Sequence, residues 1–108
     1  MGDRGNIVLE MEGGDIYLYT HRGGSDLKQT LRDALDRGRD RWNDESYLAR
    51  IIFSEMIKGD INGTTGYGIA PYAPDNEHDL IILDCLKQTI TIGGNSVTFE
   101  QFANHPVI

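Results

Sequence analysis

Two mainly apolar runs at the start of the chain predict a β-hairpin. Two runs rich in β-branched and aromatic residues, Asn6–Met11 and Asp15–Thr20, are separated by Glu12-Gly13-Gly14, and glycine supplies the positive φ that a tight hairpin turn requires. In the second run both alternating sets of side chains are largely apolar. We therefore expect the second strand to lie inside the sheet or to be covered on both faces.

Apolar residues then recur every three to four positions, which predicts two helices. Ser25 is expected to cap the first helix, which continues to Gly38. Asn43 is expected to cap the second helix, with Trp42 and Tyr47 in the positions of a hydrophobic staple. Because the second helix is apolar over more than half of its circumference, we expect it to be the most buried element.

An irregular stretch rich in glycine and proline, Gly59–Asp79, separates the helices from the C-terminal elements, and loops of this length are usually functional or disordered. The strands expected in this half are Tyr67–Ala70 within the irregular stretch, then Leu80–Leu83 and Gln88–Ile92 as an antiparallel pair. Gly93–Ser96 is expected to form the next turn. Thr98 and Gln101 have the spacing of a capping box, which predicts a short helix that ends before Pro106.

The order of these elements, β-β-α-α-(β)-β-β-α, predicts an α+β fold over residues 1–108. We expect a four- or five-stranded, mostly antiparallel sheet packed on the helical pair Ser25–Lys58, with a short C-terminal helix. A chain of 108 residues has the length of one typical domain.

The charge of the chain narrows the choice of partners. Asp and Glu number 17 and Lys and Arg 10, which gives a net charge of −7 and argues against binding to duplex nucleic acid or to an anionic membrane. Residues 22–50 hold seven basic and six acidic side chains, whereas residues 59–108 hold one basic and six acidic. We therefore expect residues 59–108 to present an acidic, partly apolar face to a protein with a basic surface.

Cys85 is the only cysteine, so an intrachain disulfide is impossible and a reducing, cytoplasmic location is expected. The first residues lack the apolar stretch of a signal peptide, and no segment has the apolar length of a membrane span. Asp84 beside Cys85 disfavours a thiolate, and no serine lies in a nucleophile elbow. Enzyme activity is therefore the less favoured hypothesis, and no cofactor is expected.

Two loops carry the chemistry of a binding site. The first, where the hairpin leads into a helix, combines small residues, free backbone N–H groups and basic side chains, a pattern that suits an anion and is equally typical of a simple turn. The second is a polar cluster before a strand, which either contacts a ligand or partner or hydrogen-bonds its loop to the sheet. Tyr67 and Tyr72 are expected at a rim, packed or stacked on a ligand. The candidate binding residues are His21, Arg22, Gly23, Gly24, Ser25, Tyr67, Asp75, Asn76, Glu77 and His78.

The three histidines, His21, His78 and His105, do not have the spacing of metal ligands. No metal site is therefore predicted. His78 beside carboxylates has the chemistry of a general base, which keeps a small hydrolase as a third hypothesis.

Four segments together, Ile16–Gly24, Arg39–Phe53, Gly66–Ile69 and Asp75–His78, resemble a family of small uncharacterised proteins from bacterial and bacteriophage genomes. The resemblance covers nearly the whole chain and implies a context and no particular activity. Small acidic proteins of such genomes often inhibit host enzymes or defence systems, or capture nucleotide signals.

The favoured hypothesis is a non-enzymatic binding protein, in line with a phage-type inhibitor whose acidic surface meets a basic host protein. The alternative is a pocket formed by His21–Ser25 and Asp75–His78 that binds a phosphate-bearing nucleotide or another anion. This alternative requires the two loops to meet in space. The sequence leaves the oligomeric state open.

Overall fold

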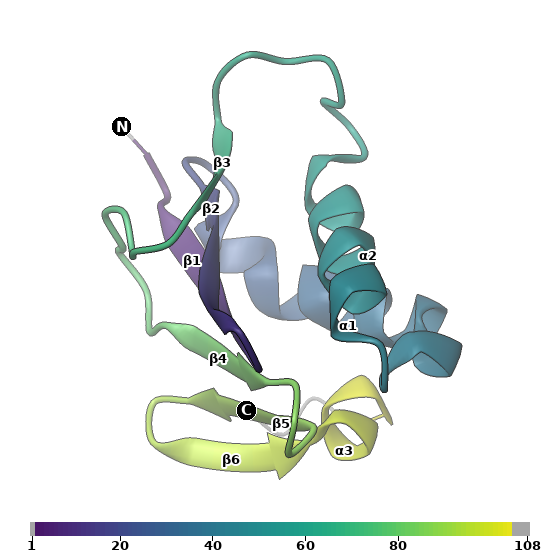
Figure 1. Cartoon of the computed structure of the whole chain (residues 1–108). Helices are drawn as coiled ribbons and strands as arrows, with labels where there is room; N and C mark the ends of the chain where they lie inside the picture. The colour runs from purple at the N-terminus through teal and green to yellow at the C-terminus, as the bar shows by residue number, and fades with distance from the viewer. Residues whose placement is uncertain (1, 105–108) are drawn as a thin grey trace.

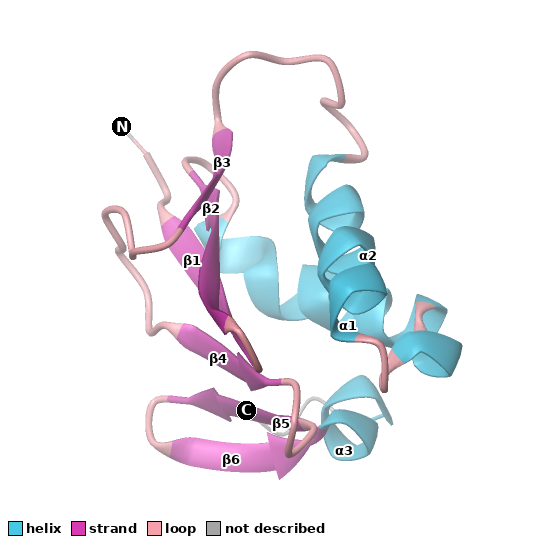
Figure 2. Ribbon diagram, viewed as in Figure 1, coloured by secondary structure: helices cyan, strands magenta, loops and turns pink. Residues whose placement is uncertain are grey.

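The computed structural model describes residues 2–104 and forms a six-stranded mixed sheet with its helices on one side (Figure 1, Figure 2). The strands are β1 (Gly5–Met11), β2 (Gly14–Thr20), β3 (Tyr67–Ala70), β4 (Ile81–Asp84), β5 (Thr89–Ile92) and β6 (Asn95–Thr98). The helices are α1 (Leu27–Arg37), α2 (Glu45–Ile57) and α3 (Phe99–Asn104), with short 3-10 turns at Gly24–Asp26 and Arg39–Arg41. The order in the sheet is β3-β2-β1-β4-β5-β6, and only β1 and β4 run parallel among these pairs.

β1 lies at the centre of the sheet and is its most buried element. Ile7 is placed opposite Leu18 of β2 and Ile81 of β4. Ile7 and Leu9 have no exposed surface, and Val8, which points to the other face, is only 2% exposed. The expectation that the second helix is the most buried element is therefore wrong, because a strand with neighbours on both edges is covered more completely than a surface helix.

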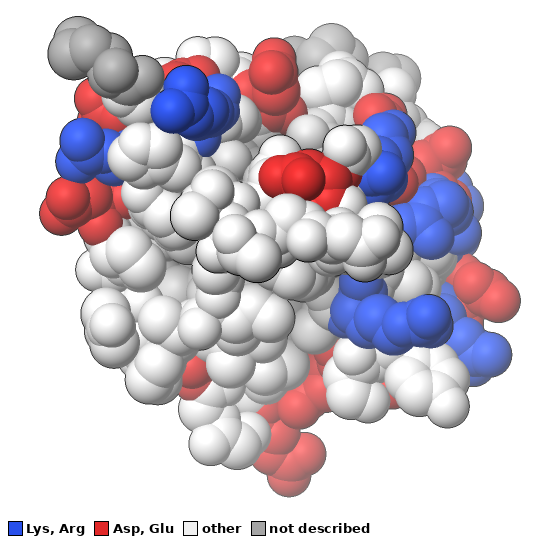
Figure 3. All heavy atoms as spheres, turned by 90° about the horizontal axis from the view of Figure 1, so that it is seen from above, with Lys and Arg blue, Asp and Glu red and all other residues white. Residues whose placement is uncertain are grey.

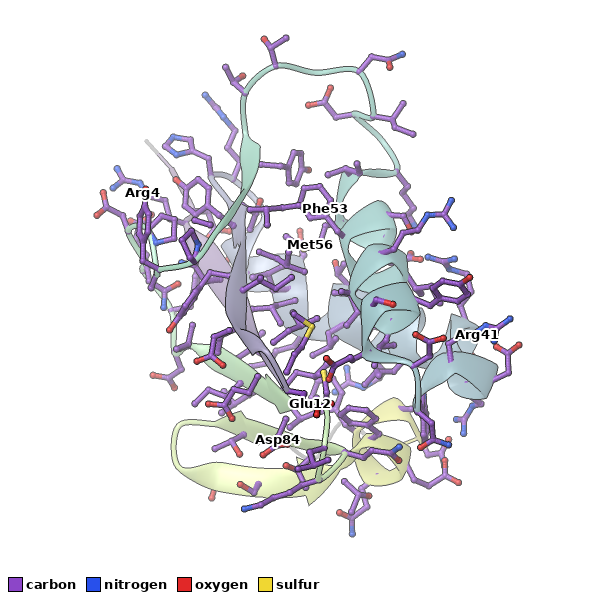
Figure 4. All side chains as sticks on the ribbon, viewed as in Figure 1. Arg4, Glu12, Arg41, Phe53, Met56 and Asp84 are labelled. Atoms are coloured by element: carbon purple, nitrogen blue, oxygen red, sulfur yellow. The ribbon has the colours of Figure 1, made fainter. Side chains whose placement is uncertain are left out.

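α2 buries one stripe of its apolar circumference and leaves the rest partly exposed. Leu48, Ile52 and Met56 are buried, whereas Phe53 and Ile57 are half-buried. Phe53 and Met56 both point from α2 toward the sheet (Figure 4). The half-buried residues lie on the side toward β3, where no further helix of residues 2–104 packs against α2.

The α+β class, the hairpin, the helical pair and the short C-terminal helix are confirmed. The sheet has six strands where four or five were expected, because Asn95 and Ser96 belong to β6 and pair with β5. The turn before β6 is confined to Gly93 and Gly94, whose φ angles of 58° and 84° suit glycine. The predicted strand Tyr67–Ala70 is confirmed as β3. The predicted end of the last helix before Pro106 lies outside the described residues.

The helix caps differ from those expected. Ser25 lies inside the 3-10 turn before α1 and is not its N-cap. Asp44, one residue after the expected Asn43, caps α2 by accepting a hydrogen bond from the backbone N–H of Tyr47 at 3.3 Å.

The predicted staple is wrong, because the ring of Trp42 packs edge-on against Phe99 with 5.5 Å between ring centres. Tyr47, its expected partner, is 55% exposed. The capping box is confirmed: Thr98 N–H donates to the Gln101 side chain at 2.9 Å, and Gln101 N–H donates to the Thr98 hydroxyl at 3.0 Å.

The segment between β3 and β4, residues 71–80, crosses the face of the sheet that the helices leave open (Figure 1). It connects two strands that run in the same direction on either side of the β2–β1 pair. Asn6, which is 1% exposed, donates from Nδ2 to the carbonyl oxygens of Pro74 at 3.3 Å and Asp75 at 3.2 Å. A buried amide of β1 therefore holds the crossing segment in place.

Candidate functional site

The two predicted loops meet, and the N-terminal segment before β1 lies between them. Asp3 N–H donates to the carbonyl oxygen of His21 at 2.8 Å, and Gly24 N–H donates to the carbonyl oxygen of Asp3 at 2.7 Å. From the other side, Glu77 N–H donates to the carbonyl oxygen of Arg4 at 2.9 Å. Residues 3 and 4 thus form the connection that sequence reasoning did not foresee.

Asp3 places its carboxylate at the start of the 3-10 turn that leads into α1. One oxygen accepts the backbone N–H of Ser25 at 2.9 Å, and the other forms a hydrogen bond with Nε2 of His78. Hydrogen bonds from Ser25, first through its side chain, and from His78 lower the pKa of Asp3 to about 2. A Cβ atom on Gly24 would lie 2.6 Å from Cδ2 of His78, so glycine is required for the loops to approach this closely.

This arrangement weakens the hypothesis of an anion site, because the main hydrogen-bond donor expected for the anion is already occupied. The backbone N–H of Ser25 already binds a carboxylate of the same chain. A pocket of about 310 Å³ lies here, and its lining includes the carboxylate of Asp79 as well as Lys28 and His78. Arg22 is exposed and does not line this pocket.

The polar cluster before β4 mainly ties the crossing segment to the start of β1. Asp75 forms an ion pair with Arg4 at 2.9 Å, and Glu77 accepts the backbone N–H of Arg4 at 2.8 Å. Asn76 donates to the carbonyl oxygen of His78 at 2.6 Å. These contacts support the interpretation in which the cluster hydrogen-bonds its loop to the sheet.

Tyr67 does not join this cluster. It lies on β3, is 36% exposed and lines a different pocket with Gly23 and Lys58. Tyr72 is 66% exposed. Of the two aromatic residues expected at a rim, Tyr67 therefore lies apart from Asp75–His78.

Sequence reasoning missed a second site, at the end of the strands opposite to the two predicted loops. It is a cleft lined by acidic residues, and we call it the acidic cleft. It has a volume of about 760 Å³ and lies where the parallel strands β1 and β4 end, beside the start of α2 (Figure 4). Carboxyl ends of parallel strands are a common position for ligands in sheets that contain them. Its carboxylates are those of Glu10, Glu12, Asp44, Glu45 and Asp84.

None of these five carboxylates forms an ion pair with a Lys or Arg side chain of residues 2–104, and no Lys or Arg lines the acidic cleft. Three of them accept hydrogen bonds from backbone N–H groups of the described residues. Glu45 accepts the backbone N–H of Glu12, Asp44 caps α2, and Asp84 accepts the backbone N–H groups of the following turn. The side chains of Glu10 and Glu12 have no such role among the described contacts.

The acidic cleft does not coincide with the acidic half of the sequence. Four of its five carboxylates come from residues 10–45, and only Asp84 comes from residues 59–108. The acidic residues of this site are far apart in the sequence and come together only through the parallel pairing of β1 with β4. The sequence alone therefore did not reveal the site. A sequence signal exists only in the position of Glu10 and Glu12 at the end of one strand and of Asp84 at the end of another.

The thiol of Cys85 lies close enough to the acidic cleft for its pKa to be affected by the carboxylates there. Burial, and then the charges of Glu45, Asp84 and Glu10, raise the pKa of the Cys85 thiol to about 12. The side chain is 8% exposed. The thiol therefore stays protonated at neutral pH, which disfavours it as a nucleophile.

No group of three or more His, Cys, Asp or Glu side chains in residues 2–104 is arranged to hold a metal ion. Over the same residues, no helix combines the length and apolar character that crossing a bilayer requires. Comparisons with known proteins found no matching protein family, no matching curated protein and no matching solved structure.

Proposed function

We propose that the protein binds a basic segment of a partner protein in the acidic cleft. The observation that carries this proposal is that five acidic residues without a Lys or Arg ion-pair partner line one cleft, from the end of β1, the hairpin turn, the start of α2 and the end of β4. Like charges brought together repel one another, and a cationic ligand relieves that repulsion. A guanidinium or ammonium group is the complementary chemistry.

The rest of the lining suits a long basic side chain. Met11, Trp42 and Leu86 line the acidic cleft beside the carboxylates, and Leu86 is 92% exposed. Lys and Arg side chains bury their methylene stems on apolar surface while their charged ends stay near polar groups. The overall charge of −7 would also speed the encounter with a basic surface.

If the resemblance to bacteriophage proteins extends to function, the acidic cleft is where an inhibitory contact with a host protein would form. The partner is defined here by its chemistry, an arginine- or lysine-rich segment on a folded or extended protein. The phosphate-binding alternative is not put forward, because Asp3 occupies the donor that it needs.

The experiment is a titration of the isotopically labelled chain with a hexa-arginine amide peptide, followed by the backbone amide resonances. We expect the largest shifts around the acidic cleft. The double variant Glu10→Gln/Glu12→Gln removes the two carboxylates without local hydrogen bonds, and it should bind the peptide roughly 2- to 30-fold more weakly, from about 0.2–1 kcal/mol per exposed charge pair.

The matched control is Asp26→Asn/Asp40→Asn, which has the same net charge and changes two carboxylates outside the acidic cleft that have no side-chain hydrogen bond in the described contacts. It should bind like the wild type. Equal weakening in both double variants, or shifts spread evenly over the surface, would mean that the peptide senses only the total charge, and the proposal would be rejected.

A further inference from the structure

The end of the sheet at β3 is an uncharged edge strand. Residues 61–74 contain no charged side chain, in a chain of which 25% is charged. Among residues 2–104, four of the six large apolar residues that are exposed lie there, at Ile61, Tyr67, Ile69 and Tyr72. The view from above, onto the end of the molecule where the loop after α2 leads into β3, shows a broad area without charged residues (Figure 3).

The backbone groups along the free edge follow from the register. His21 N–H donates to the carbonyl oxygen of Gly66 at 2.9 Å, in line with the β2–β3 pairing. Because bonded and non-bonded pairs alternate along an antiparallel ladder, Gly68 and Ala70 are the next residues that bond to β2. The N–H and C=O groups of Tyr67 and Ile69 therefore point away from the sheet.

An apolar groove adjoins this edge on the helix side. It has a volume of about 420 Å³ and is lined by Ile16 of β2, Ile69 of β3, and Phe53 and Ile57 of α2, among others. Ile69 is 58% exposed, because α2 does not extend over the edge strand. Natural edge strands are commonly protected by short length, charges, prolines or bulges. β3 is short but has no charge, proline or bulge within its four residues, and Pro71 follows it directly.

We infer that β3 pairs with β3 of a second copy of this chain, antiparallel and centred on Gly68, so that the sheets of two copies join into one. In this arrangement Tyr67 of one copy lies opposite Ile69 of the other. Each outward N–H and C=O group then finds a partner, and the aromatic and β-branched side chains form favourable cross-strand pairs. A twofold axis makes the two contacts identical.

The edge is complementary to itself and carries no charge, which favours a second copy as the occupant. Two copies that each carry −7 repel one another wherever acidic surfaces face, and residues 61–74 are the uncharged stretch through which they can approach. The other edge, β6, presents Asn95 and Ser96 and lacks exposed apolar residues. Because the paired segment is short, the contact area is at the low end for specific interfaces, and we expect a dissociation constant of roughly 10–100 µM.

Sedimentation equilibrium of the full chain between about 5 and 500 µM tests this association. The mass should rise with concentration from 12.1 kDa toward that of a dimer. Raising the salt concentration should tighten the dimer, because it screens the repulsion between two acidic copies. A mass that stays at 12.1 kDa over the whole range would overturn the inference.

Two matched variants test the surface. Ile69→Lys and Tyr47→Lys each replace an exposed apolar residue by lysine and have the same net charge, but Tyr47 lies at the start of α2 and lines neither the acidic cleft nor the groove beside β3. Ile69→Lys should weaken association at least tenfold, and Tyr47→Lys should dimerise like the wild type. Equal effects of the two variants would contradict pairing through β3.

Hydrogen exchange of the wild type gives a test that needs no variant. The amides of Gly68 and Ala70 should be protected at every concentration, because they bond to β2. The amides of Tyr67 and Ile69 should become protected only as the dimer forms. A dimer without this alternating change would mean that the copies associate through another surface. The acidic cleft contains no residue of 61–74, so failure of this inference leaves the peptide titration unaffected.

Discussion

Asn6 is a buried polar side chain whose amide fastens the crossing segment to the central strand, which makes it an informative target for substitution. Its Nδ2 atom has two protons and lies within 3.2–3.4 Å of three acceptors, the carbonyl oxygens of Pro74 and Asp75 and Oδ1 of Asn76. Its own Oδ1 atom is buried without a partner. Asn6→Asp keeps the shape of the side chain and replaces the donor by a negative charge that faces three oxygens.

The size of the effect follows from two contributions. Loss of the amide donor leaves buried carbonyl groups unsatisfied, at a cost of about 1–3 kcal/mol. The new carboxyl group can avoid burying a charge by taking up a proton, and at pH 7 protonating a group of ordinary pKa costs at most about 4 kcal/mol. A protonated carboxyl then donates to one of the acceptors. We therefore expect Asn6→Asp to lower the free energy of unfolding by about 3–5 kcal/mol at pH 7, a large share of the stability of a small domain.

The assay is guanidinium unfolding followed by the fluorescence of the single tryptophan, Trp42, at pH 7 and pH 4. The folded-state pKa of the introduced carboxyl is raised above its unfolded value, so the penalty grows as the pH rises above about 4 and shrinks to about 1 kcal/mol at pH 4. Asn95→Asp, on the exposed edge of β6, is the control and should change stability by less than about 0.5 kcal/mol. Equal stabilities of the two variants at pH 7, or a penalty that is the same at pH 4, would refute the reasoning.

Three further predictions concern other contacts. In an NMR titration Asp3 should have a pKa of about 2. Ser25→Ala should raise that pKa toward 3.8, since the hydrogen bond from the Ser25 side chain lowers it the most. An unchanged titration midpoint would contradict the contact between Asp3 and the Ser25 side chain. Because folding lowers this pKa, the stabilisation is present above pH 3.8 and is lost as the pH falls through about 2. Gly24→Ala would place a Cβ atom 2.7 Å from the carbonyl oxygen of Asp3 and should lower the free energy of unfolding, measured by thermal unfolding, by about 1–3 kcal/mol. The control is Gly59→Ala, where a Cβ atom meets nothing within 4 Å, and it should change stability by less than about 0.5 kcal/mol. Similar losses in the two variants would argue against the steric reasoning. Cys85, with its pKa at about 12, should react with a disulfide reagent at pH 8 about 100-fold more slowly in the folded than in the unfolded chain, and fast labelling of the folded chain would show that it is accessible.

Local chemistry explains the elements that the sequence predicted well. The hairpin turn at Glu12-Gly13-Gly14 and the capping box of Thr98 and Gln101 involve residues within a few positions of one another. β3 at Tyr67–Ala70 was recognisable from its β-branched and aromatic residues between glycine and proline. In each case the deciding interaction lies inside a short window of sequence.

Contacts between distant segments decided the rest. Ser25 has the chemistry of a helix cap, but Asp3, 22 positions earlier, binds its backbone N–H. Asn95 and Ser96 favour a turn by propensity, yet pairing with β5 draws them into β6. The acidic cleft requires Glu10 and Asp84 to be neighbours across a parallel pair, which no local pattern encodes.

The parallel pairing of β1 with β4 also sets the order in which the chain can fold during synthesis. β1 leaves the ribosome before β4, and its second edge has no partner until Asp84 has followed. The hairpin of β1 and β2 can form early, but a nascent chain that ends before Ile81 exposes the backbone of what becomes the most buried strand. Cooperative folding therefore waits for the C-terminal strands, and a truncation in the crossing segment leaves an aggregation-prone edge.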